Sequence, residues 1–233
     1  MLPTTYSLPA PAGLPRVPRA VALGIFDGVH LGHRAVISRA VGRENTRAAV
    51  FTFSQPSWSL PKSNAWELLS AEGRAAAFAS LGVEEIIEAD FDAIRDMSPE
   101  AFVREILHEQ LDARLVCCGF NFHFGRDGAG DAARLAELCA AHGIETSIAE
   151  AVMIDGEPVS ASRIRRLIEQ GEVQQAARLL GRPFTIDFAV VGSISGGCSE
   201  RRPSTSRCPR ILCARASGFT PRVWRWTAGC GTG

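Results

Sequence analysis

Apolar strands and amphipathic helices alternate along most of this chain, and this alternation constrains the fold more than any other feature. From Ala20 to about Glu150, short apolar runs rich in Val, Ile and Phe are separated by helix-length amphipathic stretches. The expected strands cover residues 20–26, 48–53, 83–89, 113–120 and 145–152, and the expected helices cover residues 31–41, 66–82, 98–111 and 131–143. Strands that alternate with helices predict an α/β fold with a doubly wound parallel sheet.

Two further amphipathic segments follow the expected sheet. Residues 160–171 and 172–182 meet at Gly171 and predict a pair of helices, after which residues 183–192 are expected to form one more strand. Beyond Gly192 the apolar periodicity stops, so the tail is expected to be unfolded. The first nineteen residues are rich in proline and lack a continuous apolar run, which predicts a loosely attached leader and not a signal peptide. The chain is therefore divided at 1–19, 20–184, 185–192 and 193–233.

The charges and cysteines limit the class of protein. The chain has 25 basic and 25 acidic residues, so its net charge does not favour nucleic acid or a membrane surface as a partner. No apolar run approaches the roughly 20 residues that span a bilayer. Cys117, Cys118 and Cys139 lie in apolar surroundings, where buried and reduced thiols are expected. These observations favour a cytoplasmic location.

The loop after the first expected strand is the strongest candidate site. It reads G-I-F-D-G-V-H-L-G-H and lies where open parallel sheets bind ligands, outside the carboxyl ends of the strands. Its glycines let the backbone approach a ligand, and the following helix presents unpaired N–H groups to anions. His30 and His33 are three residues apart and share one helix face, about 5–6 Å apart at Cβ. Such a pair can donate hydrogen bonds to phosphate oxygens that gain charge during a reaction. No third Cys or His is spaced to complete a metal site.

Two later segments carry polar residues that belong at the same edge. G-F-N-F-H-F-G follows an apolar strand, so Asn121 is expected beside the histidines, where an amide can orient a phosphate or a nucleophile. Ser162 and Arg163 begin the first helix of the later pair, and a guanidinium suits a leaving pyrophosphate. Ser160 is equally well explained as a helix cap. Arg165 and Arg166 are expected on a solvated face.

Four segments, in order, resemble the bacterial FAD synthetase family, which carries an H-x-G-H nucleotidyltransferase domain. The resemblance extends over about residues 20–192, which is more specific than any single motif. Two departures from the family pattern are Ser57-Trp58 in place of His-Pro, and Ala161-Ser162 in place of Ser-Thr. The matching segments are G-I-F-D-G-V-H-L-G-H (24–33), T-F-S-Q-P (52–56), C-G-F-N-F-H-F-G-R-D-G-A-G-D (118–131) and V-S-A-S-R-I-R through G-R-P-F (159–184).

The resemblance implies an FMN adenylyltransferase, in which the terminal phosphate of FMN attacks the α-phosphorus of ATP. The FMN phosphate is an anion near neutral pH, so alignment and charge stabilisation are expected to carry the reaction without a strong base. Mg²⁺ is expected with ATP, although no carboxylate can be named as its ligand. Catalytic roles are implied for His30, His33 and Asn121. Contacts to ATP or flavin are implied for Gly24, Phe26, Asp27, Gly28, Gly32, Phe122, Gly125, Ser160, Ser162 and Arg163, with the backbone of Phe26–Gly28 against the adenylate.

The tail bears on a second activity. Bacterial FAD synthetases of this type usually continue into a riboflavin kinase domain, and residues 185–192 stand where its first strand would begin. The kinase motifs P-T-x-N and G-V-Y do not occur after that point. Back-translation in a shifted frame permits P-T-(F/I/L/V)-N from Arg201–Thr205 and F-G-V-Y from Ala216–Thr220. We therefore predict a frameshift near Ser195–Glu200, with loss of riboflavin kinase activity.

Other functions stay open from the sequence. One is a different H-x-G-H nucleotidyltransferase, of the cytidylyltransferase or phosphopantetheine adenylyltransferase type, which would share the phosphate loop. Another is a non-catalytic remnant that binds flavin or nucleotide. A third is an RNA-binding protein that uses the arginine-rich tail. The expected partners are ATP and FMN, with no nucleic acid and no membrane.

Overall fold

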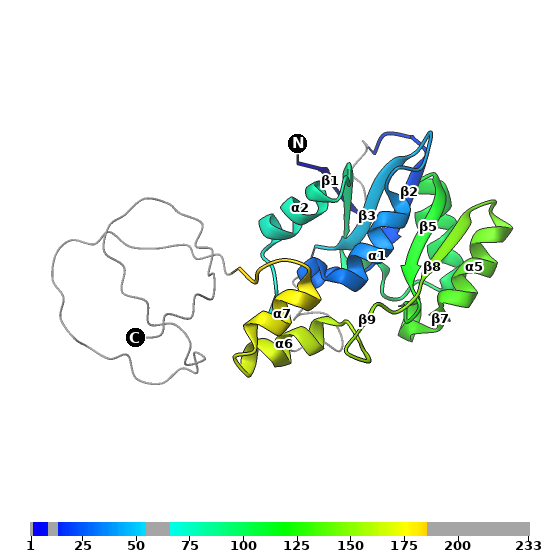
Figure 1. Cartoon of the computed structure of the whole chain (residues 1–233). Coiled ribbons are helices and arrows are strands. Elements are labelled where there is room, and N and C mark those ends of the chain that lie inside the picture. The colour runs from blue at the N-terminus through cyan, green and yellow to red at the C-terminus, as the bar shows by residue number, and fades with distance from the viewer. Residues whose placement is uncertain (1, 9–13, 55–65, 186–233) are drawn as a thin grey trace, which may run out of the picture.

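The computed structural model describes residues 2–8, 14–54 and 66–185. Six strands form one sheet in the order β1-β4-β3-β2-β5-β8, and every neighbouring pair is parallel. The predicted α/β fold with a doubly wound parallel sheet is thus confirmed (Figure 1). The strands are β1 (Thr4–Leu8), β2 (Arg19–Leu23), β3 (Arg47–Phe53), β4 (Glu85–Ala89), β5 (Ala113–Gly119) and β8 (Glu145–Ala149).

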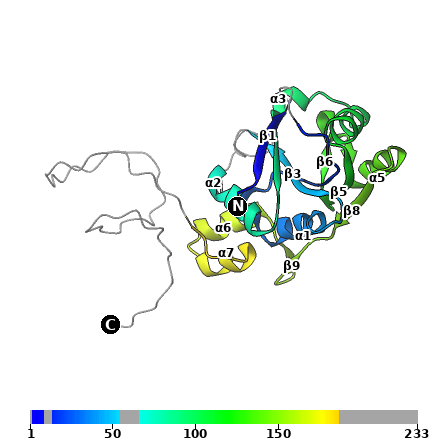
Figure 2. The ribbon, with the colours of Figure 1, turned by 90° about the horizontal axis from the view of Figure 1, so that it is seen from above.

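Helices cover both faces of the sheet (Figure 2), because the central strands are apolar on both sides. One core packs under α1 (Leu31–Ala40) and α2 (Ala71–Ser80), and includes Ile37 and Phe78. The other packs under η3 (Phe102–Gln110) and α5 (Ala132–Ala141), and includes Leu107 and Leu135. The remaining elements are η1 (Asp27–Val29), α3 (Phe91–Ile94), α4 (Pro99–Ala101), β6 (His123–Phe124), η4 (Arg126–Gly128), β7 (Gly130–Asp131), β9 (Met153–Ile154), β10 (Glu157–Pro158), α6 (Ala161–Glu169) and α7 (Val173–Leu180).

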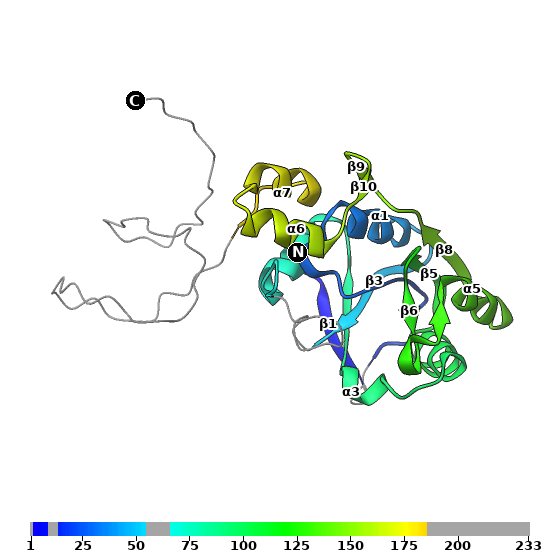
Figure 3. The same ribbon diagram turned by 90° about the horizontal axis from the view of Figure 1, so that it is seen from below.

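The two predicted C-terminal helices are present as α6 and α7 and lie beside the start of α1 (Figures 1 and 3). A third apolar cluster joins Ile164 of α6 to Leu179 and Leu180 of α7, and Leu31 of α1 packs against it. The short β9–β10 hairpin precedes α6. No helix in the described part of the chain is long and apolar enough to cross a membrane.

The prediction that residues 1–19 form a loosely attached leader is wrong for residues 4–8. Residues 4–8 form β1, which pairs in parallel with β4 from Thr4↔Glu85 to Leu8↔Ala89, and Leu8 is buried in the core. The stretch T-T-Y-S-L contains β-branched and aromatic residues that fit a strand. The surrounding prolines concealed it, because a strand this short gains its stability only from a partner far away in the sequence.

One helix boundary was also misplaced. The helix expected over residues 66–82 begins at Ala71, where the Ser70 hydroxyl accepts a hydrogen bond from the Gly73 N–H and caps it. By contrast, the helix expected from Ser98 begins as predicted, with Ser98 as its cap and Pro99 in the first turn. The first expected helix contained its capping serine, Ser70, inside its range, whereas the second began at its capping serine, Ser98. A serine cap therefore marked the true start of both helices.

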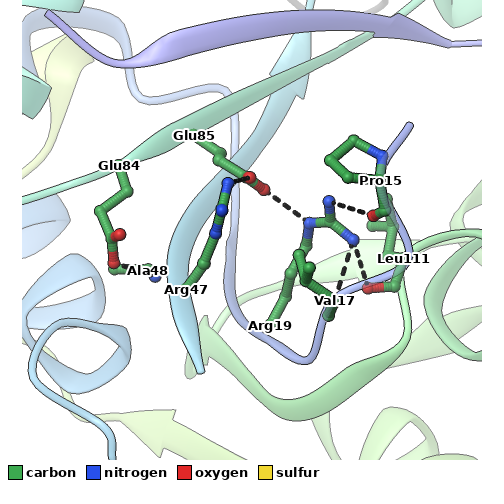
Figure 4. Close-up of polar contacts among 8 residues, drawn as sticks. All are labelled: Pro15, Val17, Arg19, Arg47, Ala48, Glu84, Glu85 and Leu111. Atoms are coloured by element: carbon green, nitrogen blue, oxygen red, sulfur yellow. Dashed lines mark hydrogen bonds and ion pairs between the residues drawn. The ribbon is translucent and has the colours of Figure 1, made fainter. Parts of the chain in front are cut away.

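The amino ends of the strands are held by a buried ion pair (Figure 4). Arg19, at the start of β2, donates from Nε to Glu85 Oε2 over 2.6 Å, and both side chains are inaccessible to solvent. Arg47 on β3 donates to the other oxygen of Glu85 over 2.9 Å. The remaining Arg19 donors are taken by the carbonyls of Pro15, Val17 and Leu111. Each buried charge here meets a partner supplied by the chain itself.

Candidate active site

The carboxyl ends of β2 and β5 form the edge where a ligand is expected. From β2 the chain winds through β3 to β4 on one side, and then returns to place β5 and β8 on the other. The strand order therefore reverses between β2 and β5, and open parallel sheets bind ligands at such switch points. The H-x-G-H loop leaves β2 here, and Asn121 follows β5. The sequence prediction that both lie at one edge is confirmed.

The loop between β2 and α1 has an unusual backbone. Phe26, Gly28 and Val29 have φ values of 54°, 78° and 40°, all left-handed. Such a conformation is costly for Phe and Val, so surrounding structure must hold it. Phe26 is buried, with its ring edge-on to Phe78 at 5.9 Å and to His33 at 5.3 Å. A Cβ on Gly28 would lie 2.7 Å from the Leu68 side chain, so only glycine fits there.

His30 and His33 stack on each other at the start of α1. Their ring centroids are 3.6 Å apart, with 19° between the ring planes. His30 caps the helix, because its Nδ1 accepts a hydrogen bond from the His33 N–H over 3.3 Å. An accepting Nδ1 carries no proton, so neutral His30 holds its proton on Nε2. His33 Nδ1 is buried and has no hydrogen-bond partner among the described residues.

Both imidazoles are neutral at neutral pH. Burial lowers the pKa of His30 from 6.5 to about 4; a backbone hydrogen bond opposes this shift, and the nearby Arg165 charge adds to it. Burial, and then neighbouring His30, holds the pKa of His33 well below its usual value. The pair therefore offers hydrogen bonds from uncharged rings. Positive charge at this site comes instead from the α1 N-terminus and from arginines.

Asp27 ties the loop to α6 across 138 residues of sequence. Its Oδ2 accepts a hydrogen bond from Arg165, and its Oδ1 accepts one from the Leu68 N–H over 2.9 Å. Arg165 also donates from Nε to the Trp66 carbonyl over 2.8 Å. Because the Asp27 carboxylate is committed to the protein, the predicted nucleotide contact at this residue is left to its backbone.

The expectation of a solvated face for Arg165 was wrong. Arg165 is buried and paired with Asp27, whereas Arg166 is exposed as expected. A signal for this was present in the sequence, since Ala161, Ile164, Arg165 and Ile168 follow the spacing of one buried helix face. Arg182, after α7, was also missed. It donates to the Gly28 carbonyl over 2.9 Å, and burial followed by nearby Arg34 lowers its pKa.

The segment after β5 combines exposed and packed residues. Asn121 is exposed, and its Oδ1 would lie 3.3 Å from a Cβ on Gly119. Phe122 is half-buried and stacks on Phe124, with ring centroids 5.8 Å apart. Gly125 has φ 75°, and a Cβ there would lie 2.8 Å from the ring of Pro99. Packing thus accounts for Gly125 without a ligand.

The comparisons with known proteins agree with this geometry. A model of the family described as FAD synthetase matches residues 16–163, which is more than half of the chain. This chain belongs to the FAD synthetase family.

Three relatives show how far the similarity extends. A bifunctional riboflavin kinase/FMN adenylyltransferase from Listeria monocytogenes is 35% identical over 74% of this chain and 57% of its own length. An FAD synthetase from the same species is 30% identical over 71% of this chain and 70% of its own length. A relative from Geobacillus thermodenitrificans is 35% identical over 71% of this chain and 90% of its own length. The chain thus spans little more than half of the first relative.

Among solved structures, a Streptococcus pneumoniae protein titled as a macrolide-efflux protein has a similar fold. It aligns with a TM-score of 0.67 and 24% identity, over 77% of this chain and 60% of its own. At this identity the likeness supports the fold alone. It agrees with the six-stranded parallel sheet described above.

The start of α6 lies next to the H-x-G-H turn. A Cβ on Gly32 would lie 3.5 Å from the Val159 carbonyl. Ser160 caps α6 by accepting from the Arg163 N–H, and Ser162 is exposed. The Arg163 side chain donates to carbonyls of the β9–β10 hairpin and pairs with Glu157 over 3.2 Å. These contacts hold the Arg163 side chain against the hairpin through its Nη1 and Nε atoms.

The described residues do not form a metal site of their own for the Mg²⁺ that is expected with ATP. Across residues 2–8, 14–54 and 66–185, no three or more His, Cys, Asp or Glu side chains gather in a way that could hold a metal ion. Asp27, the carboxylate of the loop, is already engaged at both oxygens. These residues fit an ion bound mainly through substrate phosphates, which is a usual arrangement for Mg²⁺.

The buried Cys117, Cys118 and Cys139 are free thiols whose pKa values burial raises.

Proposed function

We propose that this chain transfers the adenylyl group of ATP to FMN. The FMN phosphate oxygen attacks the α-phosphorus of ATP and forms a new P–O bond. The bond from the α-phosphorus to the bridging oxygen breaks, and pyrophosphate leaves with the electron pair. Membership of the FAD synthetase family supports this reaction, as do the names of the relatives. The observation that carries the proposal is the stacked His30–His33 pair at the α1 N-terminus.

His30 and His33 would stabilise the charge that develops on the phosphate oxygens. The Nε2 proton of His30 is free of the capping contact, and His33 brings a second ring whose Nδ1 is buried and unpaired. Neutral donors in a water-poor site act strongly on developing charge, because they need no reorganisation during the reaction. Binding of the polyphosphate would raise the pKa of both rings, since a nearby anion favours the protonated form.

The other site residues would bind and align the substrates. The backbone of Phe26–Gly28 would contact the adenylate, and Gly24 and Gly32 flank it without side chains. Asn121, exposed at the end of β5, would orient the reacting phosphate. Ser162 and Arg163 would close over the pyrophosphate. Mg²⁺, if carried by ATP, supplies neutralisation of phosphate charge.

We further propose that this chain lacks the riboflavin kinase activity found in the bifunctional relatives. Riboflavin kinase activity is expected to be absent, because the frameshift predicted near Ser195–Glu200 removes its motifs. Those residues, and the rest of 186–233, lie outside the described residues, so the frameshift stays a prediction. The DNA sequence of the locus tests it directly, and an intact frame through this region would refute it. A cytoplasmic location also stays a prediction.

The deciding experiment incubates the full chain with ATP and FMN, and measures FAD together with pyrophosphate. Parallel reactions replace FMN by phosphopantetheine or riboflavin, or replace ATP by CTP with a phosphorylated alcohol. FAD formed only from ATP and FMN supports the proposal. Turnover of another pair would favour a different nucleotidyltransferase. Binding of ATP and FMN without pyrophosphate release would favour a non-catalytic remnant.

A further inference from the structure

Arg182 contacts the H-x-G-H loop from the other end of the described chain. It follows α7, and its Nη2 donates to the Gly28 carbonyl over 2.9 Å, across 154 residues of sequence. Arg165 of α6 pairs with the side chain of the preceding loop residue, Asp27. Two arginines, one in α6 and one just after α7, therefore hold consecutive residues of the loop. Both lie beyond residues 16–163, the segment that the family model matches.

The end of α7 gives the Arg182 side chain its direction. The helix ends at Gly181, which has φ 67°, and the Arg182 N–H donates back to the Ala177 carbonyl over 3.3 Å. This is the left-handed helix ending that glycine favours. A Cβ on Gly181 would lie 2.6 Å from the Leu31 side chain, so the turn packs tightly against the start of α1. Arg182 thus leaves a turn that is anchored on the helix next to the histidines (Figure 1).

The position of Arg182 is not explained by a gain in stability at Arg182 itself. Burial, and then the charge of Arg34, lowers the pKa of Arg182, so both oppose a guanidinium at this place. Within the described part of the chain its side chain donates to carbonyls, those of Gly28 and Pro183. Arrangements that cost stability are found where a functional site requires them.

The Gly28 carbonyl belongs to the part of the loop that most needs support. Phe26, Gly28 and Val29 all have left-handed φ values, and such a backbone persists only where the surroundings determine it. His30 comes two residues after Gly28 and caps α1 through its Nδ1. A rotation of the peptide between Gly28 and Val29 would therefore move the histidine pair.

We propose that Arg182 is a positioning residue for the adenylyl transfer. It fixes the Gly28 peptide, and through it the His30–His33 pair, without contacting the substrates. The kinetic part of this inference rests on the proposed function. Misplacement of a catalytic group by about 1 Å can lower a rate about a hundredfold, so one hydrogen bond to the loop has a large effect on turnover.

Steady-state kinetics of the full chain test this role. Arg182→Met removes the donors, so kcat for FAD formation should fall about tenfold to a hundredfold, with the KM for ATP changed less than about threefold. Arg182→Lys keeps a charged donor for the single bond to Gly28 and should recover most of kcat. Arg178→Met removes an exposed α7 arginine that pairs with Asp155, and this matched control should keep the wild-type kcat. A wild-type kcat in Arg182→Met, or no recovery in Arg182→Lys, overturns the proposal.

NMR of the histidine side chains separates this proposal from the adenylyltransferase activity. If the wild type forms no FAD, the proposed function fails, and the imidazole signals decide the positioning role. Arg182→Met should shift the signals of His30 and His33 and leave those of the other three histidines in place. Arg182→Gln, which is too short to keep the bond to Gly28, should give the same shifts if Arg182→Met does not fold. Unchanged signals of His30 and His33, or equal shifts in Arg178→Met, overturn the positioning role whether or not FAD forms.

Discussion

The two ends of the sheet bury charges in different ways. At the amino end, Arg19 and Glu85 are fully enclosed, and every group that Arg19 offers is taken by Glu85 or by a backbone carbonyl. At the carboxyl end, Asp27 and Arg165 form a similar buried pair beside the H-x-G-H loop. There, however, the neighbouring histidines are neutral, and His33 Nδ1 has no partner in the described structure.

This difference separates a structural end from a binding end. Arg19 and Glu85 are enclosed and engaged with groups of the chain itself, so this pair holds the strands together and does not face a ligand. The carboxyl end keeps hydrogen-bonding capacity unused, in a backbone loop held in an unfavourable conformation. Unused capacity and strain of this kind cost stability, and they concentrate where a ligand binds.

The largest effect should come from the histidines, which only the carboxyl end possesses. His30→Ala and His33→Ala should each lower FAD formation about a hundredfold to a thousandfold, as removal of one preorganised donor typically does. Steady-state kinetics with ATP and FMN measure the loss, and circular dichroism checks that the variants fold. His108→Ala, at an exposed position near the end of η3, is the matched control and should keep most of the activity. Wild-type turnover in either His30→Ala or His33→Ala would remove the assigned role.

The two buried ion pairs can be compared directly. Glu85→Gln at the amino end and Asp27→Asn at the carboxyl end should each lower the free energy of unfolding by about 3–5 kcal/mol, because each strands a buried arginine. Urea denaturation measures this loss. Activity per folded molecule should then fall for Asp27→Asn alone, since its loop carries the histidines. Equal activity losses in both variants would erase the functional distinction between the ends.

Acid should weaken the carboxyl end through His30. The pKa of His30 is about 4 in the folded protein and 6.5 when unfolded, so below pH 6.5 the unfolded chain binds more protons. The stabilisation is complete above pH 6.5 and is lost as the pH falls to about 4, by about 3 kcal/mol. Urea denaturation across this range should show a steeper pH dependence for the wild type than for His30→Gln. Parallel profiles would contradict the pKa assigned to His30.

The smallest effect concerns the start of α6. Ser160 caps this helix, so Ser160→Ala should cost about 1 kcal/mol of unfolding free energy. Ser162→Ala, exposed in the same turn, should leave stability nearly unchanged and raise the KM for ATP if Ser162 contacts phosphate. Thermal denaturation and ATP saturation curves separate the two roles. A stability loss for Ser162→Ala equal to that of Ser160→Ala would contradict this division.

Much of the fold and part of the site could be predicted because their signals are local. Apolar periodicity gave most of the strands and helices, and the H-x-G-H spacing located the loop at the end of β2. The placement of Asn121 followed from topology, since parallel strands end at one edge. The predictions failed where a residue depends on distant partners. Arg165 lies in an apolar helix stripe, yet nothing near it in the sequence pointed to Asp27.

By itself, the sequence determined the order of the main strands and helices from β2 onward, the parallel sheet and the position of the H-x-G-H loop. The tertiary structure decided the rest. It placed residues 4–8 as a strand against β4, enclosed the His30–His33 pair so that the pKa of each is lowered, and joined Asp27 to Arg165. The physical reason is that hydrophobic pattern and backbone propensity act between neighbours, whereas pKa and ion pairing depend on burial and on groups brought together only by folding.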